Sequence, residues 1–444
     1  MSEEKREGGL SAPTRHPLNQ HDPIFHDATD LNNELARVYD ICHGCRRCVS
    51  LCNAFPVLFD LVDGSPTLEV DGVAVADYQK VVDQCYLCDL CYMTKCPYVP
   101  PHEWNVDFPH LMLRAKIVNY ENGNTKLRDN IITSTDLIGK VATMPVINTW
   151  VNAANRNETL RGALDSTMQI HKDARLPEYK RPTLRQTLQP RIDAMISEDT
   201  DARVILFTTC YCNYNEPDLG DSLYKVLRHN DVTVEIMARE YCCGMPKLEL
   251  GDLKSVDHLL QKNIPQLFEK VQKGWKIIAP VPSCVLMFKQ ELPLLYPDDE
   301  RVLAVGKAFF DPFEYLHKLH KDNRLKTEFV NSLGNVSYHV ACHQRVQNIG
   351  PKTKQILELI PGTSVKAIER CSGHDGTYGV KKESLAFANK IVQPVVRQIK
   401  QQTPDYYGSD CPVAGRHIEN NLKDMDSSQE HAHPLDLLCK AYGI

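Results

Sequence analysis

The spacing of hydrophobic residues along the chain changes near residue 200. Before it, apolar residues recur at helical intervals in the segments 109–123 (PHLMLRAKIVNYENG) and 135–156 (TDLIGKVATMPVINTWVNAANR). After it, short strand-like runs (RVILF, VTVEI and WKIIAPV) alternate with amphipathic stretches such as residues 255–274. This alternation predicts βαβ units around a partly parallel sheet, so we expect an α+β multidomain protein with a helical first half.

Five segments follow from this change in pattern. Residues 1–30 are polar and proline-bearing, which predicts a disordered tail. Residues 31–120 are dense in cysteine, and residues 121–200 form a helical segment that ends in a charged, proline-bearing linker. Residues 201–325 and 326–444 form two α/β lobes.

The helical segment also carries a set of apolar residues that allow two roles. One role is a surface for a membrane or a partner protein, and the other is packing in a core. We predict core packing for this set, which consists of Ile138, Val141, Val146, Ile147, Trp150 and Val151.

The two lobes look like copies of one unit. In both, a cysteine follows each of three strand-like runs, and equivalent cysteines are separated by 132, 128 and 127 residues. Three nearly equal offsets indicate an internal duplication. The pairs are Cys210 with Cys342, Cys243 with Cys371, and Cys284 with Cys411.

The composition of the chain argues against several classes of protein. The 444 residues carry a formal charge of −6, which does not fit a general nucleic-acid binder. No run reaches the ~18 consecutive apolar residues of a transmembrane segment, and the first residues lack the pattern of a signal peptide. We therefore expect a cytoplasmic protein, bound at most peripherally at the cytoplasmic face of the membrane.

Seventeen cysteines are the unusual feature, and eight of them lie between Cys42 and Cys96. A reducing cytoplasm disfavours structural disulfides, so clustered thiols point to metal. The first run is C-x2-C-x2-C-x3-C, and the second repeats it with one extra residue before its last cysteine, Cys96. Three thiolates at three-residue intervals wrap one cubane, and the fourth cysteine of each run ligates the other cluster.

This spacing predicts two [4Fe–4S] clusters. The first is held by Cys42, Cys45, Cys48 and Cys96, and the second by Cys85, Cys88, Cys91 and Cys52. Asn53 replaces the proline of the bacterial ferredoxin pattern, and the long spacer between the runs indicates a helical ferredoxin-type module. A zinc ribbon leaves half of these thiols unexplained, and neither run contains the C-x-x-C-H of haem attachment.

The lobes resemble a known group of proteins. Cys210 followed by Cys242-Cys243-Gly244 resembles the cysteine-rich CCG domain of the heterodisulfide reductase B subunit family. A ferredoxin module followed by two such lobes is similar to the glycolate oxidase iron–sulfur subunit and to the C subunit of anaerobic glycerol-3-phosphate dehydrogenase. The segments YHVACHQRVQNIG and CSGHDGTYGVKKE resemble the second lobe of that group.

The family's lobe ends in a C-x-x-C pair, of which this chain keeps half. Val281 and Ala414 stand where the missing cysteines are expected, and Ser372 replaces one of a double cysteine. Lobe 1 therefore keeps Cys210, Cys242, Cys243 and Cys284 as a candidate site for a further Fe–S cluster or zinc. Lobe 2 keeps Cys342, Cys371 and Cys411, with His343, His374 or His417 as candidates to complete the set; buried apolar-like cysteine is the alternative for both.

These features predict an electron-transfer subunit rather than a complete enzyme, and no residue is predicted to be catalytic. By resemblance, the chain relays electrons between a flavoprotein dehydrogenase or reductase and an acceptor, either a quinone or a small diiron protein. No G-x-G-x-x-G follows a strand, so bound NAD or flavin is not expected. Two alternatives stay open: a stand-alone heterodisulfide-reductase-like enzyme acting on thiol, disulfide or peroxide-linked substrates, and a non-redox zinc-binding scaffold.

Overall fold

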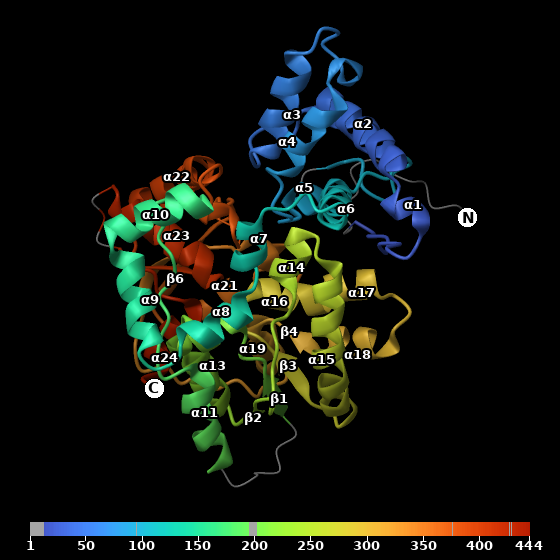
Figure 1. Ribbon diagram of the computed structural model, residues 1–444. Coiled ribbons are helices and arrows are strands. Elements are labelled where there is room, and N and C mark those ends of the chain that lie inside the picture. Colours follow the sequence, from blue (N-terminus) through green and yellow to red (C-terminus); the bar gives the residue numbers. More distant parts are fainter. Residues whose placement is uncertain (1–12, 95, 195–201, 375, 426, 428) are drawn as a thin grey trace.

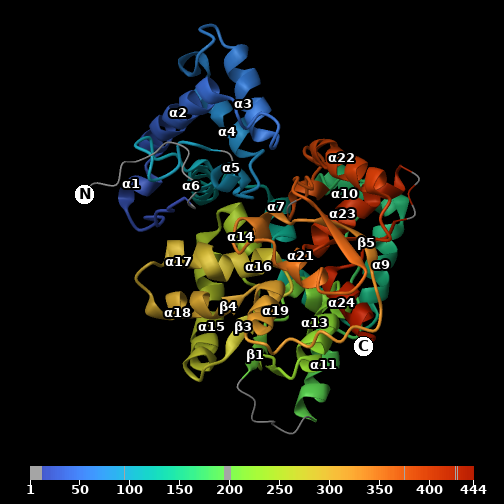
Figure 2. The ribbon, with the colours of Figure 1, turned by 180° about the vertical axis from the view of Figure 1, so that it is seen from behind.

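Helices make up the first half of the chain, and the first strand of a sheet begins only at Arg203 (Figure 1). The computed structural model describes residues 13–94, 96–194, 202–374, 376–425, 427 and 429–444. A helical N-terminal region lies on top of two α/β lobes, and the view from behind shows the lobes side by side beneath it (Figure 2). The expected α+β multidomain architecture is confirmed.

The N-terminal region is built on its longest helix, α2, whose first turn is capped by the Asp27 carboxylate. Tyr39 of α2 packs against Tyr78 and Phe108, and Phe108 in turn contacts Phe55. These aromatic rings pack between the helices that carry the two cysteine runs, on the side that faces away from solvent. The helices are α1 (Pro23–His26), α2 (Ala28–Cys45), α3 (Ala54–Asp63), α4 (Tyr78–Val82), α5 (Leu90–Thr94) and α6 (Phe108–Glu121), with short 3₁₀ turns at Val70–Gly72 and Val75–Asp77.

The expectation of a disordered tail over residues 1–30 does not hold for residues 13–30. Leu18 donates its backbone N–H to the Leu294 carbonyl at 2.9 Å, and the Gln20 amide donates to the Leu295 carbonyl at 2.9 Å. Residues 23–26 then form α1. Residues 1–12 of the predicted tail lie outside the described residues. The described part ties the N-terminal region to lobe 1 because it finds buried hydrogen-bond acceptors there, which its polar composition did not reveal.

Short helices connect the N-terminal region to lobe 1 and run along the outside of the molecule (Figure 1). They are α7 (Leu127–Ile132), α8 (Thr135–Ala142), α9 (Ile147–Arg156), α10 (Glu158–Met168) and α11 (Leu184–Asp193). The prediction of core packing is wrong here: none of the six apolar residues of 138–151 is buried, and Val146 and Trp150 are 69% and 73% exposed. Helix α9 has no buried residue at all. The apolar face is real, but the fold places it outward.

Lobe 1 has a parallel sheet with strand order β2-β1-β3-β4. The three strand-like runs of the sequence become β1 (Arg203–Leu206), β2 (Thr233–Glu235) and β3 (Lys276–Ile278), and β4 (Phe309–Phe310) adds an edge. The helices around it are α12 (Cys210–Tyr214), α13 (Pro217–His229), α14 (Met245–Leu250), α15 (Leu253–Gln272), α16 (Pro282–Leu286), the π-helix η3 (Met287–Glu291), α17 (Leu292–Leu295), α18 (Glu300–Ala308) and α19 (Pro312–Lys321).

Lobe 2 repeats the arrangement with a parallel sheet of order β6-β5-β7. In both lobes the first strand is central and the second and third flank it, as the duplication predicts. Its elements are β5 (Gly334–His339), α20 (Cys342–Arg345), α21 (Lys352–Leu357), β6 (Thr363–Ile368), the 3₁₀ turn Tyr378–Val380, α22 (Leu385–Gln402), β7 (Tyr406–Ser409), α23 (Pro412–Lys423) and α24 (Pro434–Tyr442).

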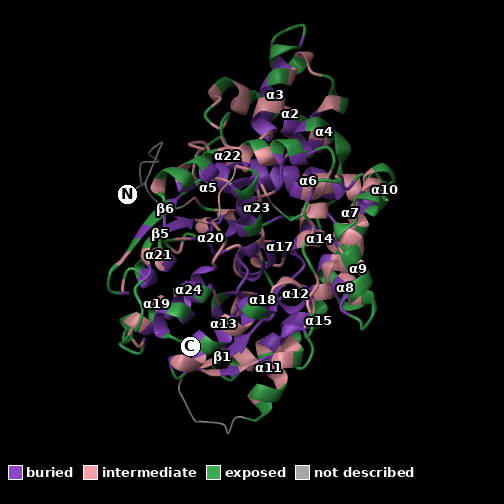
Figure 3. Ribbon diagram, turned by 90° about the vertical axis from the view of Figure 1, so that its left-hand side faces the viewer, coloured by how far each residue is buried: buried purple, intermediate pink, exposed green. Residues whose placement is uncertain are grey.

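All three parts contribute to one shared buried cluster, and the N-terminal region and lobe 2 each have a further cluster of their own. Tyr86, Leu113 and Ile117 of the N-terminal region belong to the same buried cluster as the strands of lobe 1 and helix α24. Figure 3 shows this buried material continuing from the lobes into the base of the N-terminal region, around α5 and α6. Among the described residues, no helix is long and apolar enough to span a bilayer. A continuous core holds the cysteines of the different parts in fixed relative positions.

Candidate metal centres

The thiols of the N-terminal region lie in two groups. Burial raises the pKa of the Cys42 thiol, and the neighbouring thiols of Cys96, Cys48 and Cys45 raise it further. Cys42 and Cys45 lie on the last turns of α2, whereas Cys96 follows α5 from the second run. The structure therefore brings a cysteine of the second run beside three of the first.

The second group combines three cysteines of the second run with one of the first. Burial raises the pKa of the Cys91 thiol, and Cys85, Cys52 and Cys48 raise it further. Cys52 is partly buried, and burial followed by Cys85 raises its pKa as well. The thiol neighbours of Cys88 within this region are Cys52 and Cys91. Cys48 is close to both groups, so the two groups are adjacent.

Two residues of the loop between α4 and α5 have backbone conformations that are unusual for residues with a side chain. Leu87 and Asp89, on either side of Cys88, have φ values of 52° and 59°, in the left-handed region that disfavours side chains. Strained residues of this kind persist where the surroundings fix them, and they concentrate at functional sites. Here they turn the Cys88 side chain into the interior.

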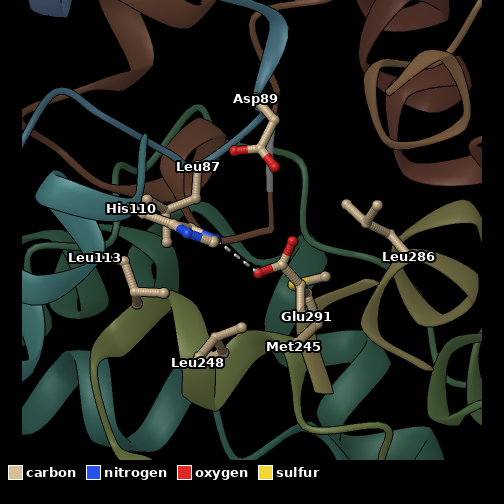
Figure 4. Close-up of a pocket in the computed structure, with 8 residues that line it drawn as sticks. All are labelled: Leu87, Asp89, His110, Leu113, Met245, Leu248, Leu286 and Glu291. Carbon is tan, nitrogen blue, oxygen red and sulfur yellow. Dashed lines mark hydrogen bonds and ion pairs between the residues drawn. The ribbon is translucent and has the colours of Figure 1, made fainter. Parts of the chain in front are cut away.

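Asp89 also anchors a buried charge cluster that the sequence analysis missed. The guanidinium of Arg15 is hydrogen-bonded to Asp89 and donates to Asp107 at 2.9 Å, and its Nη1 lies 3.7 Å from Glu291 of the π-helix. The ring of His110 is hydrogen-bonded to Glu291 at 3.4 Å across a cavity of about 10 Å³, large enough for one water (Figure 4). The only sequence signal for it was an acid between two cysteines.

The electrostatics of this cluster depend on Arg15. Burial raises the pKa of Asp89 even though Arg15 opposes it. The pKa of Asp107 falls to about 2 because His110 and Arg15 together outweigh its burial. The cluster joins α5, α6 and lobe 1, and it sits directly beside the second thiol group.

All four predicted thiols of lobe 1 come together at the carboxyl ends of its strands. Cys242 accepts hydrogen bonds from the Cys210 and Cys243 thiols, which lowers its pKa, and Cys243 is also hydrogen-bonded to Cys284. Thr135, at the start of α8, lies 3.3 Å from the Cys210 sulfur and 3.6 Å from that of Cys242. Parallel strands gather the residues that follow them at one edge of the sheet, which explains the grouping.

The predicted thiols of lobe 2 follow its strands, and two of them, Cys342 and Cys371, adjoin the N-terminal region. Cys342 and Cys371 are the thiols that most raise the pKa of Cys88 after burial itself. The Tyr86 hydroxyl lies 3.0 Å from the Cys371 sulfur. Cys411 follows β7 and neighbours Tyr211 and Tyr407. Lobe 2 therefore meets the second thiol group at an interface that spacing alone did not show.

The three candidate histidines have different surroundings. The His343 ring is hydrogen-bonded to Ser283 at 2.7 Å and to the Leu87 carbonyl at 3.4 Å, so it bridges lobe 1 and the Cys88 loop. His374 and His417 face one another with ring centroids 5.1 Å apart. Burial lowers their pKa to about 3 and about 4, and one nitrogen of each has no hydrogen-bond partner in the described structure.

The donor chemistry of these groups suits soft metals. Thiolates select zinc and iron–sulfur clusters. Within the described ranges, no three or more His, Cys, Asp or Glu side chains have the arrangement of a metal-ion site. The candidate ligands for a metal or a cluster are the thiols that neighbour one another. They form two groups of four in the N-terminal region and one group of four in lobe 1, and the cysteines that follow the strands of lobe 2 are further candidates.

Comparison with known proteins shows that both lobes match the same domain family. Residues 204–289 and 336–418 each match the CCG family, described as a cysteine-rich domain. Over 344 residues, 76% of this chain and 82% of the relative, the sequence is 29% identical to the C subunit of the anaerobic glycerol-3-phosphate dehydrogenase of Escherichia coli K12. The expected resemblance is confirmed. The two lobes are called the cysteine-rich lobes below.

More distant relatives share part of the chain. The B subunit of the fumarate reductase (CoM/CoB) of Methanothermobacter marburgensis is 27% identical over 253 residues, 56% of this chain and 48% of that protein. Lactate utilization protein A of Bacillus cytotoxicus is 27% identical over 215 residues, 47% of this chain and 87% of the relative.

Proposed function

We propose that the chain is the iron–sulfur electron-transfer subunit of an oxidoreductase complex. Cys42, Cys45, Cys48 and Cys96 would hold one [4Fe–4S] cluster, and Cys52, Cys85, Cys88 and Cys91 the second. When bound, such clusters accept and release single electrons. The observation that carries the proposal is the exchange of a cysteine between the two runs, because it is the arrangement that the motif spacing predicts for a two-cluster ferredoxin-type module.

The surroundings of the second group suit a relay. Cys85, Cys88 and Cys91 are buried, so the protein excludes water from that side. Cys371 and Cys342 of lobe 2 adjoin Cys88, and Tyr86 fills the space between. This continuity supports transfer from the N-terminal module toward lobe 2, and His343 links the same loop to lobe 1.

The partner and the acceptor follow from the relatives and from the surface. Two relatives are named as subunits of a dehydrogenase and of a reductase, which supports a partner protein, such as a flavoprotein, that supplies electrons. The acceptor would be a quinone or a small redox protein. The outward apolar face of α8 and α9, with Trp150 and Val146 exposed, supports peripheral docking of the chain on that partner, at the cytoplasmic face of the membrane.

Metal analysis tests the cluster assignment. Protein purified without oxygen should contain about eight iron and eight sulfide for two cubanes, and more if a cysteine-rich lobe is also loaded. Zinc with little iron would overturn the proposal in favour of a scaffold.

Substitution of one ligand tests the grouping. Cys88→Ala should remove one reducible signal in electron paramagnetic resonance and leave the second. The matched control is Cys439→Ala, a buried cysteine of α24 that lies 3.5 Å from the Ser222 carbonyl, away from the proposed ligands, and it should leave both signals. An unchanged spectrum in Cys88→Ala would contradict the assignment.

A further inference from the structure

A cavity of about 330 Å³ opens at the edge of lobe 1, beside the sulfur atoms of Cys210 and Cys242. Its walls are helix α8, the start of α11, the loop between β1 and α12, and the segment that follows β2. The volume lies at the lower end of the range of small-molecule sites. We call it the Arg185 pocket.

The pocket has more cationic than anionic side chains. Lys140, Arg185 and Arg239 line it, against the two acids Asp136 and Glu240. Asp136 accepts a hydrogen bond from a tyrosine hydroxyl and lies near Lys140. For Arg239, which is exposed at the rim, no ion pair or hydrogen bond is found within the described part of the chain. The charge excess favours an anionic ligand.

The carboxylate of Glu240, which follows β2, is held by hydrogen bonds from the loop between β1 and α12. It accepts hydrogen bonds from the backbone N–H groups of Thr208 and Thr209, both at 2.8 Å, and from the Thr208 hydroxyl at 2.9 Å. These three donors hold both of its oxygens. Glu240 forms an ion pair with Arg185 at 3.8 Å but makes no hydrogen bond to it.

The guanidinium of Arg185 is held in place by hydrogen bonds, but one of its nitrogens has no hydrogen-bond partner. Its Nη2 donates to the Met237 and Ala238 carbonyls, which fixes the guanidinium against the segment after β2. Its Nη1 is buried and has no hydrogen-bond partner, and the nearest Glu240 oxygen is 3.8 Å away, beyond hydrogen-bond reach. A buried N–H without an acceptor is unfavourable, and a carboxylate oxygen is the acceptor that guanidinium groups bind best.

We propose that the Arg185 pocket binds a small organic carboxylate, with the carboxylate beside the Arg185 guanidinium and the remainder of the molecule against the lining residues Tyr214, Tyr241, Cys210 and Cys242. Arg239 and Lys140 at the rim attract the anion. The charged lining argues against a quinone head group, which is neutral. The proposal concerns binding and does not depend on which metal the thiols hold.

Calorimetric titration of the anaerobically purified full chain with benzoate tests the proposal. Benzoate has nine non-hydrogen atoms, and benzamide is its uncharged analogue. We expect saturable binding of one benzoate per chain, at least about tenfold weaker binding of benzamide, and weaker binding at high salt. Menadione and inorganic phosphate should bind less tightly than benzoate.

Variants locate the site. Arg185→Gln should weaken benzoate binding by about tenfold or more, and Arg239→Gln by roughly threefold, because a rim charge contributes less. Arg301→Gln, an exposed arginine of α18 that pairs with Asp299, is the matched control and should bind as the wild type does. Cys88→Ala should also bind benzoate normally, which separates this proposal from the cluster assignment.

Several results would overturn the inference. These are no saturable binding of benzoate, equal binding of benzamide or menadione, tighter binding of phosphate, or unchanged affinity in Arg185→Gln. Arg185 also holds two backbone carbonyls, so that variant is checked by near-ultraviolet circular dichroism. If it does not fold, Arg239→Gln decides, since its side chain is exposed: unchanged affinity there refutes the site.

Discussion

Replacing Arg15 with alanine removes a guanidinium that lies among two buried carboxylates, Asp89 and Glu291, and the partly buried carboxylate of Asp107. The Arg15 side chain is 11% exposed, and those of Asp89 and Glu291 are 5% and 7% exposed. Breaking a buried ion pair by removing one partner costs about 3–5 kcal/mol, because the remaining charge is left uncompensated. Asp107 is 20% exposed and partly solvated, so we expect a loss near the lower end, about 3 kcal/mol.

The loss should appear at the junction of the N-terminal region with lobe 1. The chain has several parts, so one global unfolding free energy does not describe it, and native-state hydrogen exchange is the suitable assay. Protection of amides in α5 and α6 should fall by about 3 kcal/mol, a factor of over one hundred in the opening constant, while β5 keeps its protection. Arg15→Lys should recover part of the loss, since it keeps the charge but not the bidentate contacts.

Arg37→Ala is the matched control, because Arg37 pairs with Glu34 on the surface of α2 and both side chains are exposed. A surface pair contributes about 0–1 kcal/mol. If Arg15→Ala and Arg37→Ala have equally small effects, or if Arg15→Ala changes protection only in residues 13–22, the first segment merely lies on the surface and the reasoning fails.

Two further predictions concern stability. Burial lowers the pKa of His339 to about 4. The unfolded chain therefore binds a proton at this residue below about pH 6.5, whereas the folded chain binds it only below about pH 4. The free energy of unfolding consequently decreases as the pH falls through this window. His339→Gln should reduce the loss between pH 6.5 and 5 by about 2 kcal/mol in urea titrations of lobe 2, and an unchanged pH profile would contradict this. Gly251 has φ +89°, and an added Cβ would lie 2.5 Å from the Lys116 carbonyl oxygen of α6. Gly251→Ala should therefore lower the protection of amides in α6 by more than about 2 kcal/mol, measured by native-state hydrogen exchange. Gly162→Ala, which meets nothing within 4 Å, should leave that protection unchanged, and equal effects would refute the close approach.

Local pattern was enough to predict the strands of the two lobes and to nominate the cysteines as candidate metal ligands. The alternation after residue 200 predicts two parallel sheets because side-chain periodicity follows from backbone geometry. A cysteine directly after a strand must lie at the sheet's carboxyl edge, so Cys210 and Cys284 could be assigned to one site before any contact was known. The same argument paired the lobes as a duplication.

Contacts between distant segments depended on the tertiary structure. Arg15 looked like part of a polar tail, yet it is buried because Asp89, Asp107 and Glu291 lie close together only after three segments pack. Periodicity shows that a helix has an apolar face but not what covers it, which is why Trp150 was assigned to a core and lies in solvent. The meeting of Cys371 with Tyr86, and the pocket around Arg185, likewise arise from packing between elements far apart in the chain, which local spacing does not encode.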